Sequence, residues 1–167
     1  MSLNIEIKKI SEDEIPILSE LATSILREHF DPIIGKAQND YMLEKFQSIS
    51  AIKEQFKKGY LYHWVKYENK NIGFLGFFPV ENKLYLSKFY LIKEYRGKKI
   101  SKKMLEFLIN YAKDRKLISI YLNVNKYNDL ATNVYKHLGF VIIREEKNDI
   151  GNGFYMDDYV FEYTIKY

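Results

Sequence analysis

Alternation of apolar and polar residues predicts seven strands along the chain. The first stretch, 3–10, alternates over most of its length. Three later runs are separated only by the polar turns 68–71 and 81–83, which predicts an antiparallel meander. Three more strands follow in the second half of the chain. The predicted strands are 3–10, 60–67, 72–80, 84–92, 117–124, 140–146 and 159–167.

Helical spacing of apolar residues fills most of the intervals between these strands. Ser11 and Glu14 form a capping box, and apolar residues then recur every three or four positions up to Leu26. The pair Asp31-Pro32, followed by Gly35, predicts the end of this helix. Further helices are predicted at 40–46, 50–58, 98–116 and within 128–140, and a loop is predicted at 147–158.

The order of these elements indicates an α/β fold with a mixed sheet. The helix 98–116 connects the strands 84–92 and 117–124, and a crossover of this kind makes the two strands parallel neighbours. The chain has 167 residues, of which 47% are hydrophobic. That is enough for one packed core, so we expect a single domain over residues 1–167.

The composition excludes several classes of function. There is no cysteine, which rules out disulfides, thiolate metal sites and a cysteine nucleophile. The three histidines are scattered, so we expect no metal site. We also expect no signal peptide and no membrane span, and place the protein in the cytoplasm. The net charge of +4 permits anionic ligands without implying nucleic acid.

The turn that opens the helix 98–116 is suited to an anion. The strand 84–92 ends, a short turn follows, and a helix begins whose free N–H groups and dipole attract negative charge. Several basic residues surround this start, and a diphosphate would be well held there. The alternative reading is a basic, solvated helix start. These basic residues are Arg96, Lys98, Lys99, Lys102 and Lys103.

The run 128–140 predicts a short helix with an unusual face. Asn128 or Asp129 is suited to cap its first turn, and Gly139 is suited to end it. Asn128, Ala131 and Tyr135 share one side of the helix. A polar side chain, a small residue and a phenol together indicate a surface against which a ligand lies. The alternative reading is an ordinary amphipathic helix.

In combination, these segments resemble the GCN5-related N-acetyltransferases. The resemblance rests on Arg-Gly-Lys-x-Ile-x at 96–101 and on Asn-x-x-Ala-x-x-x-Tyr-x-x-x-Gly-Phe at 128–140, in the family's order of elements. Gly-Phe-Tyr-Met-Asp at 153–157 resembles the PaiA type of spermidine/spermine acetyltransferase. The resemblance implies a central, mostly antiparallel sheet of about seven strands flanked by helices. It also implies that the sheet is splayed between 84–92 and 117–124.

The resemblance further implies acetyl-CoA as the cofactor, with its pyrophosphate wrapped by the loop that starts at Arg96. Lys99 and Ser101 replace two glycines of the family's loop. The lysine side chain either swings outward, or contacts a phosphate directly, or marks a weakened CoA site. The residues expected to bind CoA are Phe89, Tyr90, Leu91, Arg96, Gly97, Lys98, Lys99, Ile100, Ser101, Asn125, Asn128, Thr132 and Tyr135.

The family reaction is direct attack of a neutral amine on the thioester carbonyl. The resemblance assigns the backbone N–H of Leu91 to the developing oxyanion and the phenol of Tyr135 to the departing thiolate. The amine must first lose a proton, and the candidates for a base are Tyr90, His29 and Glu28. Asn128 is expected to hold the pantetheine amides.

The expected acceptor is a primary amine of a small molecule, with a polyamine as the named guess. An antibiotic amine, an amino acid and a protein or peptide amine remain alternatives. A non-catalytic CoA-binding or regulatory module is a further reading, and a basic nucleic-acid-binding protein is the weakest. We expect a monomer or a homodimer. The candidate substrate residues are His29, Asp31, Asp40, Tyr41 and Tyr155.

Overall fold

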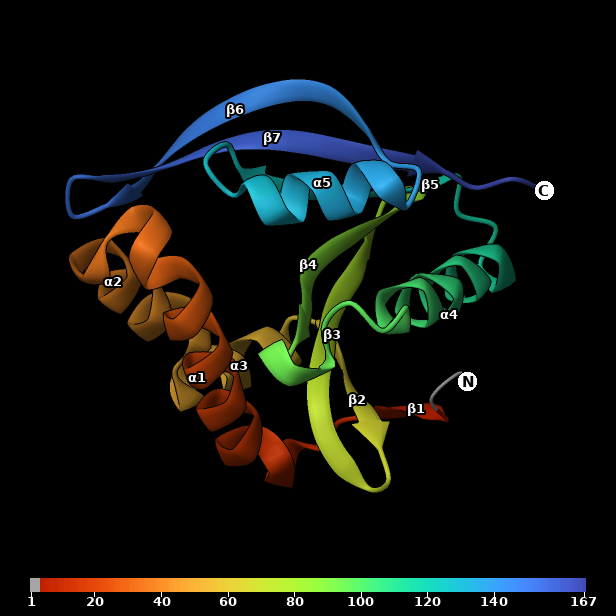
Figure 1. Cartoon of the computed structure of the whole chain (residues 1–167), viewed down its shortest axis with the longest axis horizontal. Helices are drawn as coiled ribbons and strands as arrows, with labels where there is room; N and C mark the ends of the chain where they lie inside the picture. The colour runs from red at the N-terminus through yellow and green to blue at the C-terminus, as the bar shows by residue number, and fades with distance from the viewer. Residues whose placement is uncertain (1–3) are drawn as a thin grey trace. The chain divides into compact units, whose positions relative to one another are not determined.

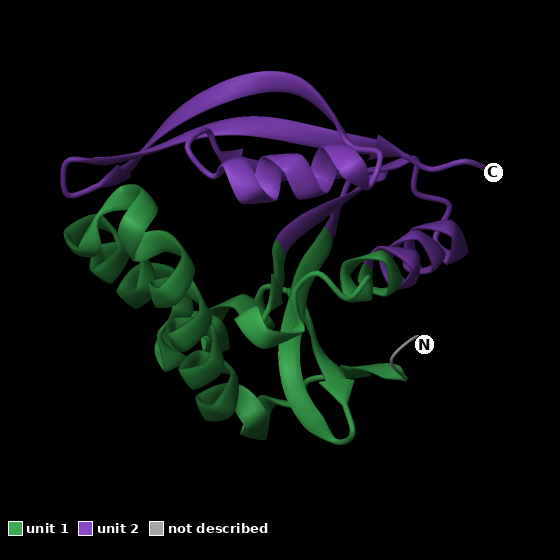
Figure 2. Ribbon diagram, in the orientation of Figure 1, with its two compact units in different colours: residues 1–78, 88–104 green, residues 79–87, 105–167 purple. Residues whose placement is uncertain are grey.

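The computed structural model describes residues 4–167 and divides into two compact units. Of the described residues, unit 1 comprises 4–78 and 88–104, and unit 2 comprises 79–87 and 105–167 (Figure 2). Two strands and one helix pass from one unit into the other along the chain. Leu3, where the first strand was expected to begin, lies outside the described residues. Among residues 4–167, no helix is both long enough and apolar enough to cross a membrane.

The strands form one hydrogen-bonded sheet in the order β1-β2-β3-β4-β5-β7-β6. Its seven members confirm the number of predicted strands. β4 and β5 are parallel, as predicted, and their described register covers only Lys83–Tyr85 against Ser119–Tyr121. The other described pairs are antiparallel. The strands are β1 Ile5–Lys9, β2 Leu61–Tyr67, β3 Lys70–Val80, β4 Lys83–Leu91, β5 Ser119–Asn125, β6 Val141–Gly151 and β7 Phe154–Thr164.

Unit 1 packs three helices against one face of β2 and β3. These helices are α1 Ile15–Ile34, α2 Lys36–Gln47 and α3 Ile49–Lys57 (Figure 1). The capping box that was predicted at Ser11 is present and precedes a short 3-10 turn, Glu12–Glu14. Its Glu14 also accepts a hydrogen bond from the buried Trp64 indole at 2.9 Å. The core consists of Ile10, Ile15, Leu18, Ala22, Ile25, Leu26, Leu43, Ile52, Tyr62, Trp64 and Phe74.

The first helix is longer than the sequence predicted. We expected Asp31-Pro32 to end it, but α1 continues through Pro32 and stops at Gly35. Proline has no N–H to donate to the carbonyl four residues earlier and its ring crowds that carbonyl, so α1 carries a local cost in its last turn. Gly35 adopts a φ of 85° and donates its N–H to the Asp31 carbonyl at 3.1 Å. Glycine reaches this left-handed conformation without strain, so the helix ends there.

Unit 2 contains a long hairpin where a loop was predicted. β6 and β7 pair from Val141 opposite Glu162 to Gly151 opposite Phe154, and only a tight turn separates them. Gly151, Asn152 and Gly153 all have positive φ, as such a turn requires. The helix α5, Asp129–His137, lies alongside this hairpin (Figure 1). The prediction of a loop at 147–158 was therefore wrong, because the polar residues there are strand residues.

Candidate functional site

The turn between β4 and the helix α4, Ile100–Asp114, is held by Arg96. Its Nε donates to the Leu91 carbonyl at 3.2 Å, and its Nη2 donates to Glu28 of α1, also at 3.2 Å. Arg96 therefore ties the turn to the end of β4 and to α1, a structural role that sequence reasoning did not assign. The helix that follows begins at Ile100, so its first N–H groups lack intrahelical partners, as at any helix start.

Lys99 adopts the backbone conformation that a glycine would take. Its φ is 63°, and Gly97 two residues earlier has a φ of 75°. The left-handed conformation is unfavourable by about 1–2 kcal/mol for a residue with a Cβ. The turn thus keeps the backbone conformation of a glycine, although this chain has a lysine where the family's loop has a glycine. Ser101 lies in the first turn of α4, and Ile100 is buried.

The end of β4 approaches β3 very closely at Gly73. A Cβ built on Gly73 would stand 2.2 Å from the Tyr90 carbonyl oxygen and 2.9 Å from the Leu91 side chain. Just beyond, the Ile92 N–H donates to the Ile72 carbonyl at 2.8 Å. The backbone at Tyr90 and Leu91 is therefore fixed against β3 by the absence of a side chain at position 73. The predicted oxyanion donor, the Leu91 N–H, belongs to this segment and stays a prediction.

Tyr90 is a packing residue on the helix-covered face of unit 1. Its ring lies 5.6 Å from Phe74 and 6.4 Å from Phe30 of α1, measured between ring centres. Phe89, its neighbour on β4, is half-buried. Tyr90 was also a candidate base, and its surroundings here are aromatic.

In unit 2, α5 presents three site candidates on one side. Asn128, Thr132 and Tyr135 follow the i, i+4, i+7 spacing of a helix face. The prediction that Asn128 or Asp129 caps the helix is confirmed for Asn128, whose Oδ1 accepts the Ala131 N–H at 3.2 Å. Tyr135 is buried and packs edge-on against Phe140 at 5.4 Å between ring centres.

Thr132 has a feature that suits a bound ligand. Within the described residues, its buried Oγ1 has no hydrogen-bond partner. A buried hydroxyl without a partner costs about 1–3 kcal/mol, which a polar ligand group at the same place would recover. The neighbouring Asn125 ends β5 and uses its Oδ1 to accept the Tyr127 N–H at 2.9 Å, shaping the turn into α5.

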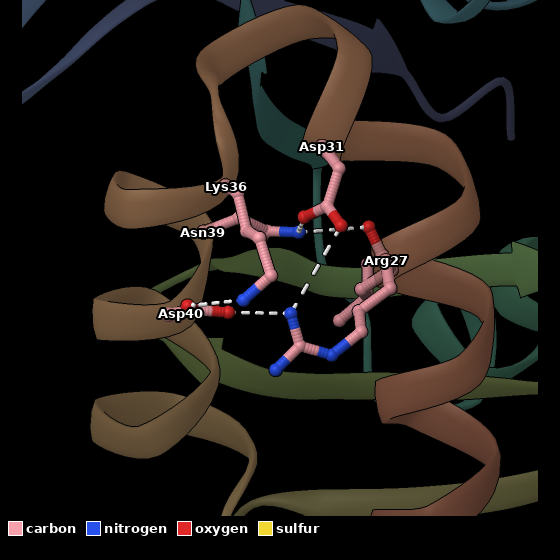
Figure 3. Close-up of polar contacts among 6 residues, drawn as sticks. Arg27, Asp31, Lys36, Asn39 and Asp40 are labelled. Atoms are coloured by element: carbon pink, nitrogen blue, oxygen red, sulfur yellow. Dashed lines mark hydrogen bonds and ion pairs between the residues drawn. The ribbon is translucent and has the colours of Figure 1, made fainter.

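Two of the candidate substrate residues, Asp31 and Asp40, make contacts between α1 and α2 (Figure 3), and their role in substrate binding stays a prediction. Arg27 and Lys36 both donate to Asp40, and these hydrogen bonds, led by that of Lys36, hold the Asp40 pKa below its ordinary value. Asp31 accepts from the Asn39 amide at 2.7 Å. The side chain of Asn39 is buried and also donates to the Leu26 carbonyl at 3.1 Å. Asp31 and Asp40 thus help to hold α1 against α2.

The other candidate substrate residues are aromatic or imidazole groups. His29 lies edge-on to Phe30 with 4.8 Å between ring centres. Tyr41 of α2 has the Lys45 ammonium 5.6 Å from its ring centre. Tyr155 belongs to β7 rather than to a loop, and its side chain remains exposed near the hairpin turn. The role of each of these three residues in substrate binding stays a prediction.

Sequence reasoning missed Asp158, a buried carboxylate on β7. Its residue exposure is 2%, and the Asn123 amide donates to it and to Glu146, at 3.3 Å in both cases. Burial raises the pKa of Asp158 to about 6. Across the described part of the chain, no salt bridge neutralises it; Lys126 pairs instead with Asp157 and Glu145. The sequence signal was an Asp-Asp pair entering an apolar strand.

Comparison with known proteins gives a consistent result. The model of the Acetyltransferase (GNAT) family matches residues 22–140. A probable spermine N(1)-acetyltransferase from Bacillus subtilis subsp. natto (strain BEST195) is 30% identical over 149 residues, which covers 83% of this chain and 88% of the relative.

Solved structures share the fold at lower identity. The PaiA N-acetyltransferase of Thermoplasma acidophilum, solved in complex with coenzyme A, has a TM-score of 0.81 at 22% identity, covering 97% of this chain and 99% of its own. A GCN5-related N-acetyltransferase from Rhodopseudomonas palustris also has a TM-score of 0.81, at 11% identity, covering 98% of both chains. At these identities the likeness establishes the fold alone.

Proposed function

The chain belongs to the acetyltransferase (GNAT) family, and on that premise we propose that it acetylates a primary amine of a small molecule in the polyamine class. The family predicted from the two sequence motifs, and the fold implied by it, are thereby confirmed. The cosubstrate of the reaction is acetyl-CoA, which supplies the acetyl group as a reactive thioester.

Each of the two units contains groups that are suited to bind acetyl-CoA. In unit 1, the glycine-like backbone at Lys99 keeps the turn before α4 in the path that suits a pyrophosphate. In unit 2, the unpartnered Oγ1 of Thr132 would receive a hydrogen bond from a pantetheine amide. Asn128 would add amide contacts on the same side of α5. We therefore assign these residues to binding of the donor.

Two groups would act on the reacting atoms. The Leu91 N–H would donate to the thioester oxygen as it gains negative charge, and its rigid place against Gly73 suits such a donor. The Tyr135 hydroxyl would donate to the departing sulfur, since a phenol remains protonated at neutral pH. Replacing Tyr135 by Phe should lower turnover while leaving the affinity for acetyl-CoA nearly unchanged.

The observation that carries the acceptor class is Asp158. A polyamine is polycationic, and a buried carboxylate without a salt bridge is a receptor for one of its ammonium groups. Burial, together with the neighbouring carboxylates of Asp157 and Glu146, raises the pKa of Asp158, and a bound ammonium group would favour its ionised form. The name of the relative that is 30% identical points to the same class of acceptor.

An acceptor panel tests the proposal. Thiol release from acetyl-CoA would be measured with spermine, spermidine, a monoamine, an amino acid and a peptide with a free N-terminus, and the products would be identified by mass spectrometry. We expect the polyamines to give the highest kcat/KM. Asp158→Asn should raise the KM for polyamines and leave that for the monoamine almost unchanged.

Asp149→Asn is the matched control, because Asp149 is exposed and its carboxylate accepts the Gly151 N–H in the hairpin turn. If the peptide gave the highest kcat/KM, the acceptor would be a protein or peptide amine and not a polyamine. Absence of thiol release with every amine, in a protein that still binds acetyl-CoA by calorimetry, would favour a non-catalytic binding module.

A further inference from the structure

The β-sheet of unit 2 has an apolar face and a polar face. Successive side chains of a strand point to opposite faces, and on β5 the half-buried Tyr121 and Asn123 alternate with the buried Leu122. The helix α5 packs on the apolar face, where the ring of Tyr135 lies 6.0 Å from that of Phe161 on β7, measured between centres (Figure 1). The polar face is therefore the one that points away from α5.

Hydrogen bonds connect three strands across this polar face. The strand register places Tyr85 of β4 beside Tyr121, and Asp158 of β7 opposite Asn125, and residues that lie directly opposite each other share a face. Between them, Asn123 accepts a hydrogen bond from the Tyr85 hydroxyl at its Oδ1, at 3.3 Å. Its Nδ2 donates to Asp158, also at 3.3 Å. A single amide group therefore links the phenol on β4 to the buried carboxylate on β7.

Asp158 differs from its carboxylate neighbours on this face, because no basic residue neutralises it within the described chain. Glu146 accepts from Arg144 Nε at 2.8 Å, and Glu162 accepts from Lys83 Nζ at 2.7 Å. A carboxylate accepts several hydrogen bonds, so an ammonium group can join the amide donor that is already present at Asp158. The polar face therefore carries a buried negative charge that a bound cation can neutralise.

Tyr85 and Tyr121, which we call the tyrosine pair, lie where the described pairing of β4 with β5 ends. Their ring centres are 5.0 Å apart, and both side chains are half-buried. Burial raises the pKa of Tyr121, so its phenol is neutral near pH 7. Neutral aromatic faces attract ammonium groups and contact methylene groups well. An amine over the tyrosine pair would therefore lie at the start of the splay between the two parallel strands.

We propose that this polar face holds the acceptor, with the reacting amine over the tyrosine pair and a second ammonium group on Asp158. The methylene chain between the two nitrogens crosses Asn123, which links these two places. This inference rests on the proposed function and deepens it, because it makes the acceptor a diamine or polyamine whose nitrogens are joined by a short methylene chain. Tyr135 lies on the other face, so the departing sulfur and the attacking amine approach the carbonyl from different sides.

Tyr85 is a positioning residue in this arrangement, because its hydroxyl holds Asn123 and Asn123 holds Asp158. Tyr85→Phe keeps the ring and its packing but removes the hydroxyl donor. We expect kcat/KM for putrescine to fall about 5-fold, as for the loss of one hydrogen bond. Butylamine has the same methylene chain without the second nitrogen, so its kcat/KM should hardly change. A purely structural role of Tyr85 would affect the two amines equally.

Tyr121 contacts the acceptor directly in this arrangement, so its loss has a different signature. Tyr121→Leu should raise the KM of both putrescine and butylamine about 10-fold and leave the KM of acetyl-CoA unchanged. Tyr163→Leu is the matched control, because it removes a half-buried ring from the opposite face of the same sheet, where Tyr163 packs against Phe140 at 5.4 Å between ring centres. We expect Tyr163→Leu to leave the KM of both amines unchanged.

Calorimetric titration of putrescine into the protein with CoA bound gives a readout that does not depend on turnover. We expect binding to weaken about 10-fold in Tyr121→Leu and to stay unchanged in Tyr163→Leu.

Three results would overturn this inference and leave the proposed function standing, provided that the wild type acetylates polyamines. They are an unchanged acceptor KM in Tyr121→Leu, an equal rise in Tyr163→Leu, and equal losses for putrescine and butylamine in Tyr85→Phe. Absence of acetylation of any amine by the wild type would overturn the proposed function, and the titration would still show whether this face binds a diamine.

Discussion

Replacing Gly73 by alanine tests whether close packing of β3 against β4 fixes the end of β4, where the proposed oxyanion donor Leu91 lies. The added Cβ would stand 2.2 Å from the Tyr90 carbonyl oxygen and 3.2 Å from Leu91 Cα. Both are backbone atoms, so no side-chain rotation relieves the overlap. β4 must move away from β3 at this point, and the hydrogen bond from Ile92 to Ile72 lies directly beside it.

The expected change in the free energy of unfolding follows from three contributions. Overpacking of this kind destabilises by about 1–3 kcal/mol. Weakening the adjacent backbone hydrogen bond adds about 1 kcal/mol. The lower entropy of the unfolded alanine chain offsets about 0.4–1 kcal/mol. We expect a net loss of about 2–3 kcal/mol, which for a chain of this size lowers Tm by about 5–10 °C. Displacement of Leu91 should also reduce kcat at temperatures where the variant is folded.

Gly76→Ala on the same strand is the matched comparison. Its Cβ would meet the Tyr62 ring at 2.9 Å and Lys88 Cγ at 3.0 Å, and the latter is a flexible side chain. We expect about 1 kcal/mol of destabilisation there. Urea unfolding and scanning calorimetry would measure both variants. A Gly73→Ala protein as stable as Gly76→Ala would show that β4 is not fixed by contact at position 73.

Three further predictions concern single residues. Lys99→Gly removes a left-handed lysine and should raise stability by about 0.5–1 kcal/mol in urea unfolding, whereas a loss would mean that the lysine side chain stabilises the turn. Asp158→Asn should be more stable than the wild type at pH 7 by about 2 kcal/mol, because the Asp158 carboxylate has a folded pKa raised to about 6 and its ionised form destabilises the fold. That difference should disappear in unfolding curves as the pH falls from 6 to below 4, where Asp158 is protonated in both states, and a constant difference would contradict the assignment. Arg96→Ala should lower stability by about 1–2 kcal/mol in the same assay through loss of its bonds to Leu91 and Glu28, and Arg96→Lys should not restore it, because one ammonium cannot reproduce both contacts.

Local signals were sufficient for much of the secondary structure. The helix α5 was predicted from its cap at Asn128 and its stop at Gly139, and both act within one or two turns of the chain. The crossover from β4 to β5 was predicted because strand–helix–strand connections are sterically restricted. The meander β2, β3, β4 was predicted from short polar turns. Each of these depends on residues that are near one another in the sequence.

The errors arose where distant residues decide the local structure. β6 is an edge strand, mostly exposed along its length, so its polar residues gave no apolar alternation and were taken for a loop. The helix α1 passes Pro32, and the pairing of Arg27, Asp31, Lys36 and Asp40 across the helix pair accompanies this extension. The contacts of Asp31 and Asp40 between α1 and α2 were not foreseen from the sequence, and the role of these two carboxylates in an amine site stays a prediction.

The sequence by itself determined the family, the order of elements and the two motifs by which the family was predicted, because these rest on spacing within short segments. Only the tertiary structure decided which charges are paired and which are alone. Asp158 looks like an ordinary charged residue in the chain, and its burial without a salt bridge follows from its place on β7 beside Asn123. A pKa depends on burial and on neighbours that are far away in sequence, so the Asp-Asp pair at the start of an apolar strand could mark Asp158 as unusual but could not give its protonation behaviour.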